Sequence, residues 1–442
     1  MTTPAIRPDD INLNDPSLFE TEQAHEMFRI LREQDPVHWN PGGDRANGFW
    51  SLTKYDDVMF VSRNPELFTS SKGIAGPGLR PEALAELMAA DPGAAAQNTG
   101  GNASIITMDP PRHVKMRRLV NKGFTPRAVN AMEPEIRRIT NEILDTIAHR
   151  SSCDFVLDVS SQLPLAVICG MMGVEQKDWP LMFELTNKVL GGGDPEYQTD
   201  VPEDQRGTAE AARLTSMTGF MGMLGYFRNV MEERRANPRE DDLVSILLES
   251  EIDGEKLTEG DLLAFCFLLV VAGNETTRNG ISGGLLALSQ HPGEKQRLLH
   301  DMSLIDGAVE EILRWATPVI HMARTVTADV EIRGKQIKAG DRVLMWYPSV
   351  NRDEDYFEDP YRFDITRTPN EHLAFGIGEH FCLGAGFARK ELRVMFEELF
   401  RRFPDIEVDG PPERLRSNFI NGIKHLPVRY TPAGQGAAVT RG

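Results

Sequence analysis

One loop of the chain reads Phe375-Gly376-Ile377-Gly378-Glu379-His380-Phe381-Cys382-Leu383-Gly384 and frames a single cysteine with three glycines. A long helical pattern follows, so the Cys382 sulfur lies at a helix N-terminus, where free backbone N–H groups and the helix dipole favour a thiolate. Gly376 and Gly378 let the backbone bend so that its amides turn towards the sulfur. Gly384 leaves room for a flat group against the start of the helix. A single shielded thiolate is a poor zinc site and a good axial ligand for haem iron.

A second interpretation of this cysteine has to be weighed first. A lone intracellular cysteine is most often a small buried hydrophobe, and Cys382 taken by itself would more commonly be that. The other cysteines, Cys153, Cys169 and Cys266, lie far apart and form neither a CxxC motif nor a secreted disulfide pattern. The rest of the chain must decide between the two interpretations.

Composition predicts a cytoplasmic protein that does not bind nucleic acid. The 442 residues include 48 basic and 66 acidic side chains, a net charge of −18, which argues against general nucleic-acid binding. Hydrophobic residues make up 40% of the chain, enough for one large core. The N-terminal segment lacks the apolar core of a signal peptide, and no stretch reaches the ~18 uncharged apolar residues that cross a bilayer. We therefore expect no membrane anchor.

The hydrophobic pattern predicts a mainly α-helical protein with small β-sheets. Apolar residues recur with a 3.6-residue period in most segments between positions 126 and 401. Strands are indicated by short runs near Val37–Trp39, Gly48–Leu52, Val330–Ile332 and Arg342–Trp346. The first two of these runs predict a β-rich subregion near the N-terminus.

No linker, repeat or low-complexity tract divides the chain, which predicts one large helical domain. We expect a disordered arm over residues 1–16, the domain over 17–431 and a disordered tail over 432–442. Residues 71–106 form a Gly/Ala/Pro-rich stretch with one weak helical piece at 81–90. A stretch of this length is typical of a functional lid or of disorder.

One long helix is predicted from Glu259 to Gln290, beginning at a capping box formed by Thr258 and Asp261. At ~1.5 Å per residue it is long enough to cross the whole molecule. Its centre, 265–272, is apolar on every side and should therefore be buried. The polar run Ala272-Gly273-Asn274-Glu275-Thr276-Thr277 then follows in a buried helix, where it is costly unless it serves a function. A Ser/Thr bond back to the helix backbone, which bends the helix, would be compatible with that function.

The loop pattern Phe-Gly-x-Gly-x-His-x-Cys-x-Gly resembles the haem-binding loop of the cytochrome P450 family, the haem–thiolate monooxygenases. The resemblance extends from about Ser17 to Tyr430 and implies the mainly helical fold of that family. It also implies a haem b cofactor with Cys382 as the ligand of the iron. The residues that it places against the haem are Phe375, Gly376, His380 and Gly384 in the loop, and Ala272 and Gly273 in the long helix.

The polar run in the long helix resembles the oxygen-activation motif of the same family. This resemblance implies that Thr276 hydrogen-bonds dioxygen, that Glu275 relays protons, and that Gly273 lets the helix backbone approach the iron. We expect Glu275 and Thr276 to be the catalytic residues.

The two haem propionates need cationic or hydrogen-bonding partners. The positions that match the family's partners are His113, Arg117, Arg324 and His380. Any one of them could be an ordinary surface cation, and that alternative stays reasonable for Arg117.

The resemblance also implies a structural trio. Glu311 and Arg314 are spaced i,i+3 on one helix face, where such pairs are common and usually exposed. In the family this Glu-x-x-Arg helix pairs with an arginine of a later meander, here Arg367. We interpret the trio as a support for the haem loop without a catalytic role.

Electrons must come from another protein, because the chain has no flavin, nicotinamide or Fe–S motif. The resemblance implies a ferredoxin with its NAD(P)H reductase. Basic residues gather on two helices expected on the cysteine side of the haem. They are Arg112, Lys115, Arg117, Arg118, Arg389, Lys390 and Arg393. Such runs are often only solvated faces, but two of them on one face of an acidic protein suggest a docking site for an acidic ferredoxin.

The substrate is expected to be lipophilic and held mainly by shape. The pocket positions carried over from the family are Leu269, Val270, Val319, Ile320, Met322, Phe419 and Ile420, and each could equally be ordinary core. His321, the one polar side chain among them, is more simply explained as a histidine bonded to backbone. Several local strings resemble bacterial members that act on terpenoid, branched-chain lipid or steroid side-chain substrates.

The predicted reaction inserts one oxygen atom of dioxygen into a C–H bond of such a molecule. Two rival functions are a peroxide-driven peroxygenase and a haem–thiolate sensor or ligand-binding protein without turnover. The Glu275–Thr276 pair disfavours both rivals, because peroxygenase relatives typically lack it and a sensor does not need it. The sequence does not identify the substrate, the oxidised position, the redox partner or the oligomeric state.

Overall fold

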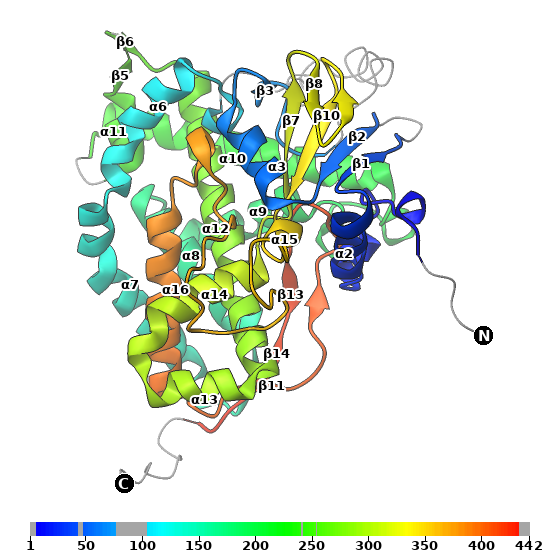
Figure 1. The fold of residues 1–442 in the computed structure, drawn as a ribbon. Coiled ribbons are helices and arrows are strands. Elements are labelled where there is room, and N and C mark those ends of the chain that lie inside the picture. The colour runs from blue at the N-terminus through cyan, green and yellow to red at the C-terminus, as the bar shows by residue number, and fades with distance from the viewer. Residues whose placement is uncertain (1–5, 43–46, 77–103, 240–241, 253, 433–442) are drawn as a thin grey trace.

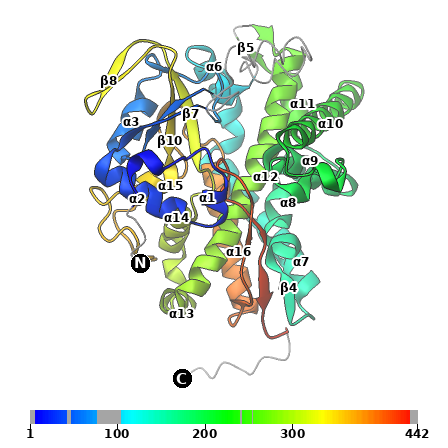
Figure 2. The same cartoon turned by 90° about the vertical axis from the view of Figure 1, so that its right-hand side faces the viewer.

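The computed structural model describes residues 6–42, 47–76, 104–239, 242–252 and 254–432. These residues form a mainly helical molecule with small sheets, as the sequence predicts. Figures 1 and 2 show the largest sheet on one side and most of the helices on the other. The predicted helical piece at 81–90, most of the stretch 71–106 and the tail from 433 onwards lie outside the described residues.

Helices account for most of the regular structure in the described chain. They are α1 (Ser17–Glu20), α2 (Ala24–Gln34), α3 (Tyr55–Arg63), α6 (Arg112–Val120), α7 (Pro126–Ile147), α8 (Gln162–Met171), α9 (Trp179–Gly191), α10 (Ala209–Ala236), α11 (Leu243–Leu248), α12 (Glu259–Gln290), α13 (Pro292–His300), α14 (Ile305–Ala316), α15 (Tyr347–Val350) and α16 (Ala385–Arg402). Short single turns include η1 (Pro8–Asp10) and η6 (Pro195–Tyr197).

The strands are short and fall into several small sheets. They are β1 (Val37–Asn40), β2 (Phe49–Leu52), β3 (Phe68–Thr69), β4 (Ser152–Asp154), β5 (Glu251–Ile252), β6 (Glu255–Lys256), β7 (His321–Val326), β8 (Val330–Ile332), β9 (Lys335–Ile337), β10 (Arg342–Trp346), β11 (Glu407–Val408), β12 (Glu413–Arg414), β13 (Ile423–His425) and β14 (Pro427–Arg429). All four predicted strand runs are confirmed, as β1, β2, β8 and β10.

The largest sheet has five strands in the order β1-β2-β10-β7-β3. β10 pairs in parallel with β2 and antiparallel with β7. In β7, His321–Val326 mixes apolar and charged residues and lacks a regular alternation, so its hydrophobic pattern by itself does not mark a strand. Its position next to β10 matters for the site, since β7 carries Arg324, one of the predicted propionate partners.

The long helix α12 has the predicted bounds, Glu259–Gln290. Its capping box is also confirmed, because the Thr258 hydroxyl accepts from the Asp261 N–H at 3.1 Å and the Asp261 carboxylate accepts from the Thr258 N–H at 3.3 Å. The helix runs through the centre of the molecule (Figures 1 and 2) and packs against α8, α9, α10, α14 and α16. Its length and apolar composition would suit a membrane crossing, but 61% of its most apolar stretch is buried inside the protein. It is therefore a core helix.

The segment before α1 differs from the sequence expectation of a disordered arm. Residues 6–16 include the turn η1 and bury Ile11 and Leu13 beside α2. The Leu13 N–H donates to the Asn40 side chain of β1 at 3.2 Å. Two apolar side chains within a polar segment are enough to hold it against the domain.

Candidate functional site

A cavity of about 1640 Å³, its opening to solvent included, lies between α12 and the loop that carries Cys382. The α12 side chains that line it follow the helical repeat i, i+3, i+4, i+7. They are Phe265, Leu268, Leu269, Ala272, Gly273, Thr276 and Thr277.

The Cys382 loop is folded by its glycines into a tight path. Gly376 and Gly378 have φ values of +65° and +76°, in the left-handed region that side chains disfavour. A Cβ at Gly378 would also lie 2.3 Å from the Ser62 carbonyl oxygen of α3. At Gly384 a Cβ would meet no atom within 4 Å, because this residue faces the open cavity. The loop therefore presses against α3 at one glycine and leaves space beside the cysteine at another.

Cys382 is the only one of the four cysteines that lines the cavity. Burial raises the pKa of its thiol, while the N–H groups of Gly384 and Ala385 and the positive charge of Arg117 oppose that rise. Cys169 and Cys266 differ, because both are packed in the core and burial raises their pKa to about 12. Cys382 combines two backbone donors with the positive charges of Arg117 and Arg389, and such an environment favours a thiolate.

Four cationic or hydrogen-bonding side chains line the cavity near this loop: His113, Arg117, Arg324 and His380. Arg324 is 7% exposed and forms no ion pair with a carboxylate of the described residues. His113 is 2% exposed, and its Nδ1 has no hydrogen-bond partner in the described chain. Its ring lies 4.3 Å from that of His380, whose pKa is lowered to about 2 by burial and by Arg324. The set is incomplete without an anion, because buried positive charge is costly when it is unpaired.

Arg117 forms a different set of contacts. Its guanidinium donates to the Glu379 carbonyl oxygen at 3.1 Å and to the Phe381 carbonyl oxygen. It therefore holds the Cys382 loop as well as facing the cavity.

These features fit a haem. Cys382 lines the cavity and open space lies beside Gly384. Among the described residues Arg324 has no carboxylate partner and His113 Nδ1 has no hydrogen-bond partner, and two propionates would provide both. The apolar α12 wall lies across the cavity from the Cys382 loop. The residues predicted to contact haem all line this one cavity: Ala272, Gly273, Phe375, Gly376, His380, Cys382 and Gly384, with the propionate partners.

The predicted acid–alcohol pair is split between two faces of α12. Thr276 lines the cavity, and its hydroxyl donates back to the Ala272 carbonyl oxygen at 2.7 Å. Glu275 is 1% exposed and does not line the cavity. It is ion-paired with Arg278, whose Nη1 donates to Asn187 of α9 at 2.9 Å. Burial raises the pKa of Glu275 and Arg278 opposes that rise, while Glu275 Oε1 has no partner in the described chain.

Glu311, Arg314 and Arg367 lie together, as the sequence suggested. Glu311 and Arg314 are fully buried and form two parallel contacts of 2.8 and 2.7 Å. Arg314 Nη1 also donates to the carbonyl oxygens of Asn351 at 2.8 Å and Pro360 at 2.9 Å. Arg367 lies 3.3 Å from the Glu311 carboxylate. The trio therefore ties α14 to the irregular segment that leads into the Cys382 loop.

Only part of the predicted substrate pocket lines the cavity. Leu269, Val319 and Met322 line it, whereas Val270 and Ile320 are packed in the core instead. Ile420 pairs with Val319 through backbone contacts. The ring of Phe419 packs edge-on against that of His321, with the ring centroids 5.4 Å apart. His321 is bonded to backbone as expected, through Asn418 O at 2.8 Å and Gly76 N at 3.0 Å.

Sequence reasoning missed several lining residues. Ile105, Ile106, Ile168 and Met171 complete the apolar wall, and Glu391 of α16 lies at its edge. The helical repeat through Leu269 and Thr276 would have identified Phe265 and Leu268. No sequence signal indicates which face of α8 meets the cavity.

The predicted basic face is partly neutralised by acidic residues of the same chain. Its ion pairs are Arg112–Asp261, Arg389–Glu310, Lys390–Glu133 and Arg393–Glu397. Arg118 is exposed and has no ion pair with another described residue. A surface hollow lies beside the outer side of Cys382, lined by Arg117, Phe381, Arg389, Lys390 and Arg393 among others. Phe381 is 40% exposed there.

Comparisons with known proteins agree with this geometry. The family model described as cytochrome P450 matches residues 216–425. A methyl-branched lipid omega-hydroxylase of Mycobacterium tuberculosis is 42% identical over 414 residues, covering 91% of this chain and 90% of the relative. A steroid C26-monooxygenase of Mycolicibacterium smegmatis is 39% identical, covering 98% of this chain and 97% of the relative.

Solved structures give the same result. The Mycobacterium marinum cytochrome P450 CYP268A2, in complex with pseudoionone, superposes with a TM-score of 0.84 at 35% identity. The match covers 97% of this chain and 100% of that one. A chain so similar over nearly its whole length shares the cofactor of the family, a haem with an axial cysteine thiolate. The chain therefore belongs to the cytochrome P450 family and is a haem–thiolate monooxygenase.

Proposed function

We propose that Cys382 ligates the haem iron and that the enzyme hydroxylates an unactivated C–H bond of a terpenoid, a methyl-branched lipid or a steroid side chain. The observation that carries the proposal is the cavity itself. Cys382 lies on one wall, and the opposite wall is an apolar face of α12 with the hydroxyl of Thr276 within it. Relatives named for methyl-branched lipids and steroids support a lipophilic substrate.

Each residue then has a defined task. When bound, the haem supplies the activation of dioxygen and the transfer of one oxygen atom to carbon. Arg324 and His113 would hold its carboxylates, and the open space beside Gly384 would accommodate its ring. Thr276 Oγ1 presents a hydroxyl to the cavity, while Glu275 Oε1 holds protons on the α9 side and passes them through water to that hydroxyl.

Electrons are proposed to come from a separate ferredoxin and its NAD(P)H reductase in the cytoplasm. The surface hollow is lined by Cys382 itself, and it combines an exposed Phe381 with surrounding cations. An apolar centre within a charged rim suits a transient electron-transfer contact. The cations that already have acidic partners contribute less to this contact than Arg117 and Arg118.

The test of this function is the coupling of electron consumption to product in Thr276→Ala. We expect product per NAD(P)H to fall by at least about tenfold, because the cavity loses its proton-delivering hydroxyl. Thr277→Ala is the matched control, since Thr277 also lines the cavity and should leave coupling unchanged. Equal coupling in wild type and Thr276→Ala would remove Thr276 from the mechanism.

The peroxygenase and the non-catalytic sensor are separated by the same assay. Turnover should require ferredoxin, reductase and NAD(P)H, with little product from hydrogen peroxide alone. Efficient peroxide-driven turnover would support a peroxygenase, and haem-loaded protein without turnover under either condition would support a sensor.

A further inference from the structure

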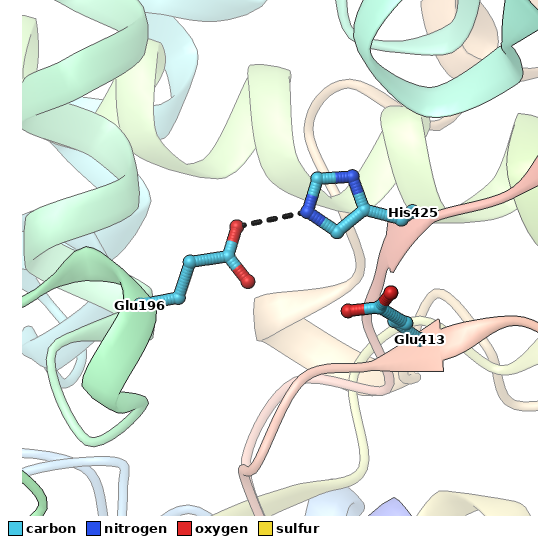
Figure 3. A group of neighbouring side chains, drawn as sticks. All are labelled: Glu196, Glu413 and His425. Atoms are coloured by element: carbon cyan, nitrogen blue, oxygen red, sulfur yellow. Dashed lines mark hydrogen bonds and ion pairs between the residues drawn. The ribbon is translucent and has the colours of Figure 1, made fainter.

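A second group of chemically active side chains lies outside the cavity, at Glu196, Glu413 and His425 (Figure 3). Glu196 belongs to η6, between α9 and α10, whereas Glu413 and His425 belong to the paired strands β12 and β13. One side-chain N or O atom from each of the three lies within 4.8 Å of the others. Glu413 and His425 are directly opposite in the strand register, so their side chains share one face.

His425 is held in the orientation that a metal ligand requires. Its Nδ1 lies 2.6 Å from Asp154 Oδ2 of β4. Its Nε2 lies 3.0 Å from Glu196 Oε1, the contact drawn as a dashed line in Figure 3. Metal-binding histidines almost always give their other ring nitrogen to a carboxylate or carbonyl, which fixes the ring and its tautomer. Asp154 provides that carboxylate from a strand that contributes no other member to the group.

Glu413 has no role in the metal-free network. Its carboxylate forms no hydrogen bond or ion pair with another residue in the part of the chain that the structure describes, although it faces His425 (Figure 3). Lys424 does not fill the space between the three groups, because its Nζ contacts the other oxygen of Glu196 at 2.8 Å and Asp194 at 3.1 Å. The Glu413 carboxylate thus lies beside the hydrogen-bonded pair of Glu196 Oε1 and His425 Nε2 and is the member of the group without a partner in the described chain.

We propose that these three side chains bind one divalent transition-metal ion of the zinc class, with water as the fourth ligand. One imidazole nitrogen and two carboxylate oxygens are a common donor set for Zn²⁺. Mg²⁺ and Ca²⁺ prefer six or more oxygen ligands, so the histidine selects against them.

The ion would join two segments beside the haem cavity. Glu196 lies in the connection that follows α9, and α9 packs on α12. The β12–β13 hairpin carries Ile420, whose backbone pairs with Val319 of the cavity wall. A bound ion therefore ties the α9–α10 connection to the hairpin and limits their separation.

The experiment is Zn²⁺ binding to tag-free, haem-loaded protein, by calorimetry and by thermal unfolding. Wild type should bind one equivalent with an increase in Tm of about 2–5 °C at saturating Zn²⁺. Glu413→Gln should bind at least about tenfold more weakly and lose the Zn²⁺-dependent increase. Its Tm without metal should equal that of wild type, because Glu413 has no contact to lose.

Glu203→Gln, an exposed acid in the same connection, is the control and should bind Zn²⁺ as wild type does. His425→Gln should also lose binding, although it loses the Asp154 and Glu196 contacts as well. The proposal fails if Glu413→Gln and wild type bind Zn²⁺ equally, if neither binds it, or if Mg²⁺ produces the same increase in Tm. None of these results depends on oxygenase activity, since the readout is metal binding.

Discussion

The two walls of the haem cavity are built in contrasting ways. On the cysteine side, buried charges and backbone hydrogen bonds fix the chain: Glu311 and Arg314 have no exposed side-chain surface, and Arg314 donates to several backbone carbonyl oxygens. On the α12 side the wall is apolar, and Thr276 bonds only within its own helix. A polar network fixes one geometry, whereas apolar packing tolerates changes of shape. We infer that the first wall sets the chemistry and the second sets the substrate.

Replacing Cys382 by Ala should have the largest effect. Without the thiolate the haem loses its electron-donating axial ligand, so we expect hydroxylation to fall by at least about a thousandfold. Steady-state product formation with ferredoxin and reductase measures the loss. Cys153→Ala, which alters a half-buried cysteine outside the cavity, should keep wild-type activity. Comparable turnover in Cys382→Ala would refute the assignment.

Replacing Glu311 by Gln tests whether the cysteine wall depends on its buried charges. Arg314 would remain buried without a countercharge, which should lower the free energy of unfolding by about 3–5 kcal/mol. Urea unfolding of the haem-loaded protein measures this. Glu26→Gln breaks an exposed pair with Arg29 and should change stability by less than about 1 kcal/mol. Equal losses in the free energy of unfolding for Glu311→Gln and Glu26→Gln would show that burial of the Glu311–Arg314 pair adds nothing to the cost of breaking it.

Glu391, at the cysteine side of the cavity, should make stability depend on pH. Burial raises its pKa from 4.5 to about 8, so the folded state retains a proton that the unfolded state releases. Its stabilising contribution is complete below pH 4.5 and is lost as pH rises to about 8. Glu391→Gln, which imitates the protonated form, should match wild type at pH 4.5 and exceed it by about 2–5 kcal/mol at pH 8. Identical stability-versus-pH curves for both proteins would contradict a buried, neutral Glu391.

The smallest expected effect lies on the α12 wall. Leu269→Ala enlarges the cavity and should weaken binding of a lipophilic substrate by about tenfold, with the haem spectrum of the substrate-free enzyme unchanged. Val270→Ala is the matched control: Val270 is fully buried and does not line the cavity, so stability should fall by about 1–3 kcal/mol with affinity unchanged. Spectral titration and urea unfolding separate the two. If Val270→Ala weakened substrate binding and Leu269→Ala lowered only stability, Val270 and not Leu269 would face the cavity.

Local signals allowed much of this structure to be predicted from sequence. Thr258 and Asp261 form a capping box that is recognisable in the sequence, so the start of α12 was predicted correctly. Cys382 was identifiable because glycines and a helix start surround it within ten residues. The four strand runs were found for the same reason, since each has its own β-type pattern.

What the sequence did not reveal depends on packing between distant segments. Glu275 and Thr276 look like one unit in the sequence, but neighbours on a helix point about 100° apart, so only Thr276 faces the cavity. Arg278, which pairs with Glu275 within α12, also donates to Asn187 of α9, and no local pattern specifies that contact between two helices. The acidic partners of the basic face were missed for the same reason: Asp261 and Glu133 lie far along the chain from Arg112 and Lys390.

The central claim is that the Cys382 sulfur is the axial ligand of the haem iron. Iron K-edge X-ray absorption of haem-loaded wild type and Cys382→Ala tests it most directly, because scattering from the first coordination shell distinguishes sulfur from nitrogen or oxygen. We expect one sulfur neighbour of the iron in wild type and none in Cys382→Ala. A wild-type iron with only nitrogen or oxygen neighbours, or a sulfur neighbour that persists in Cys382→Ala, would contradict the claim.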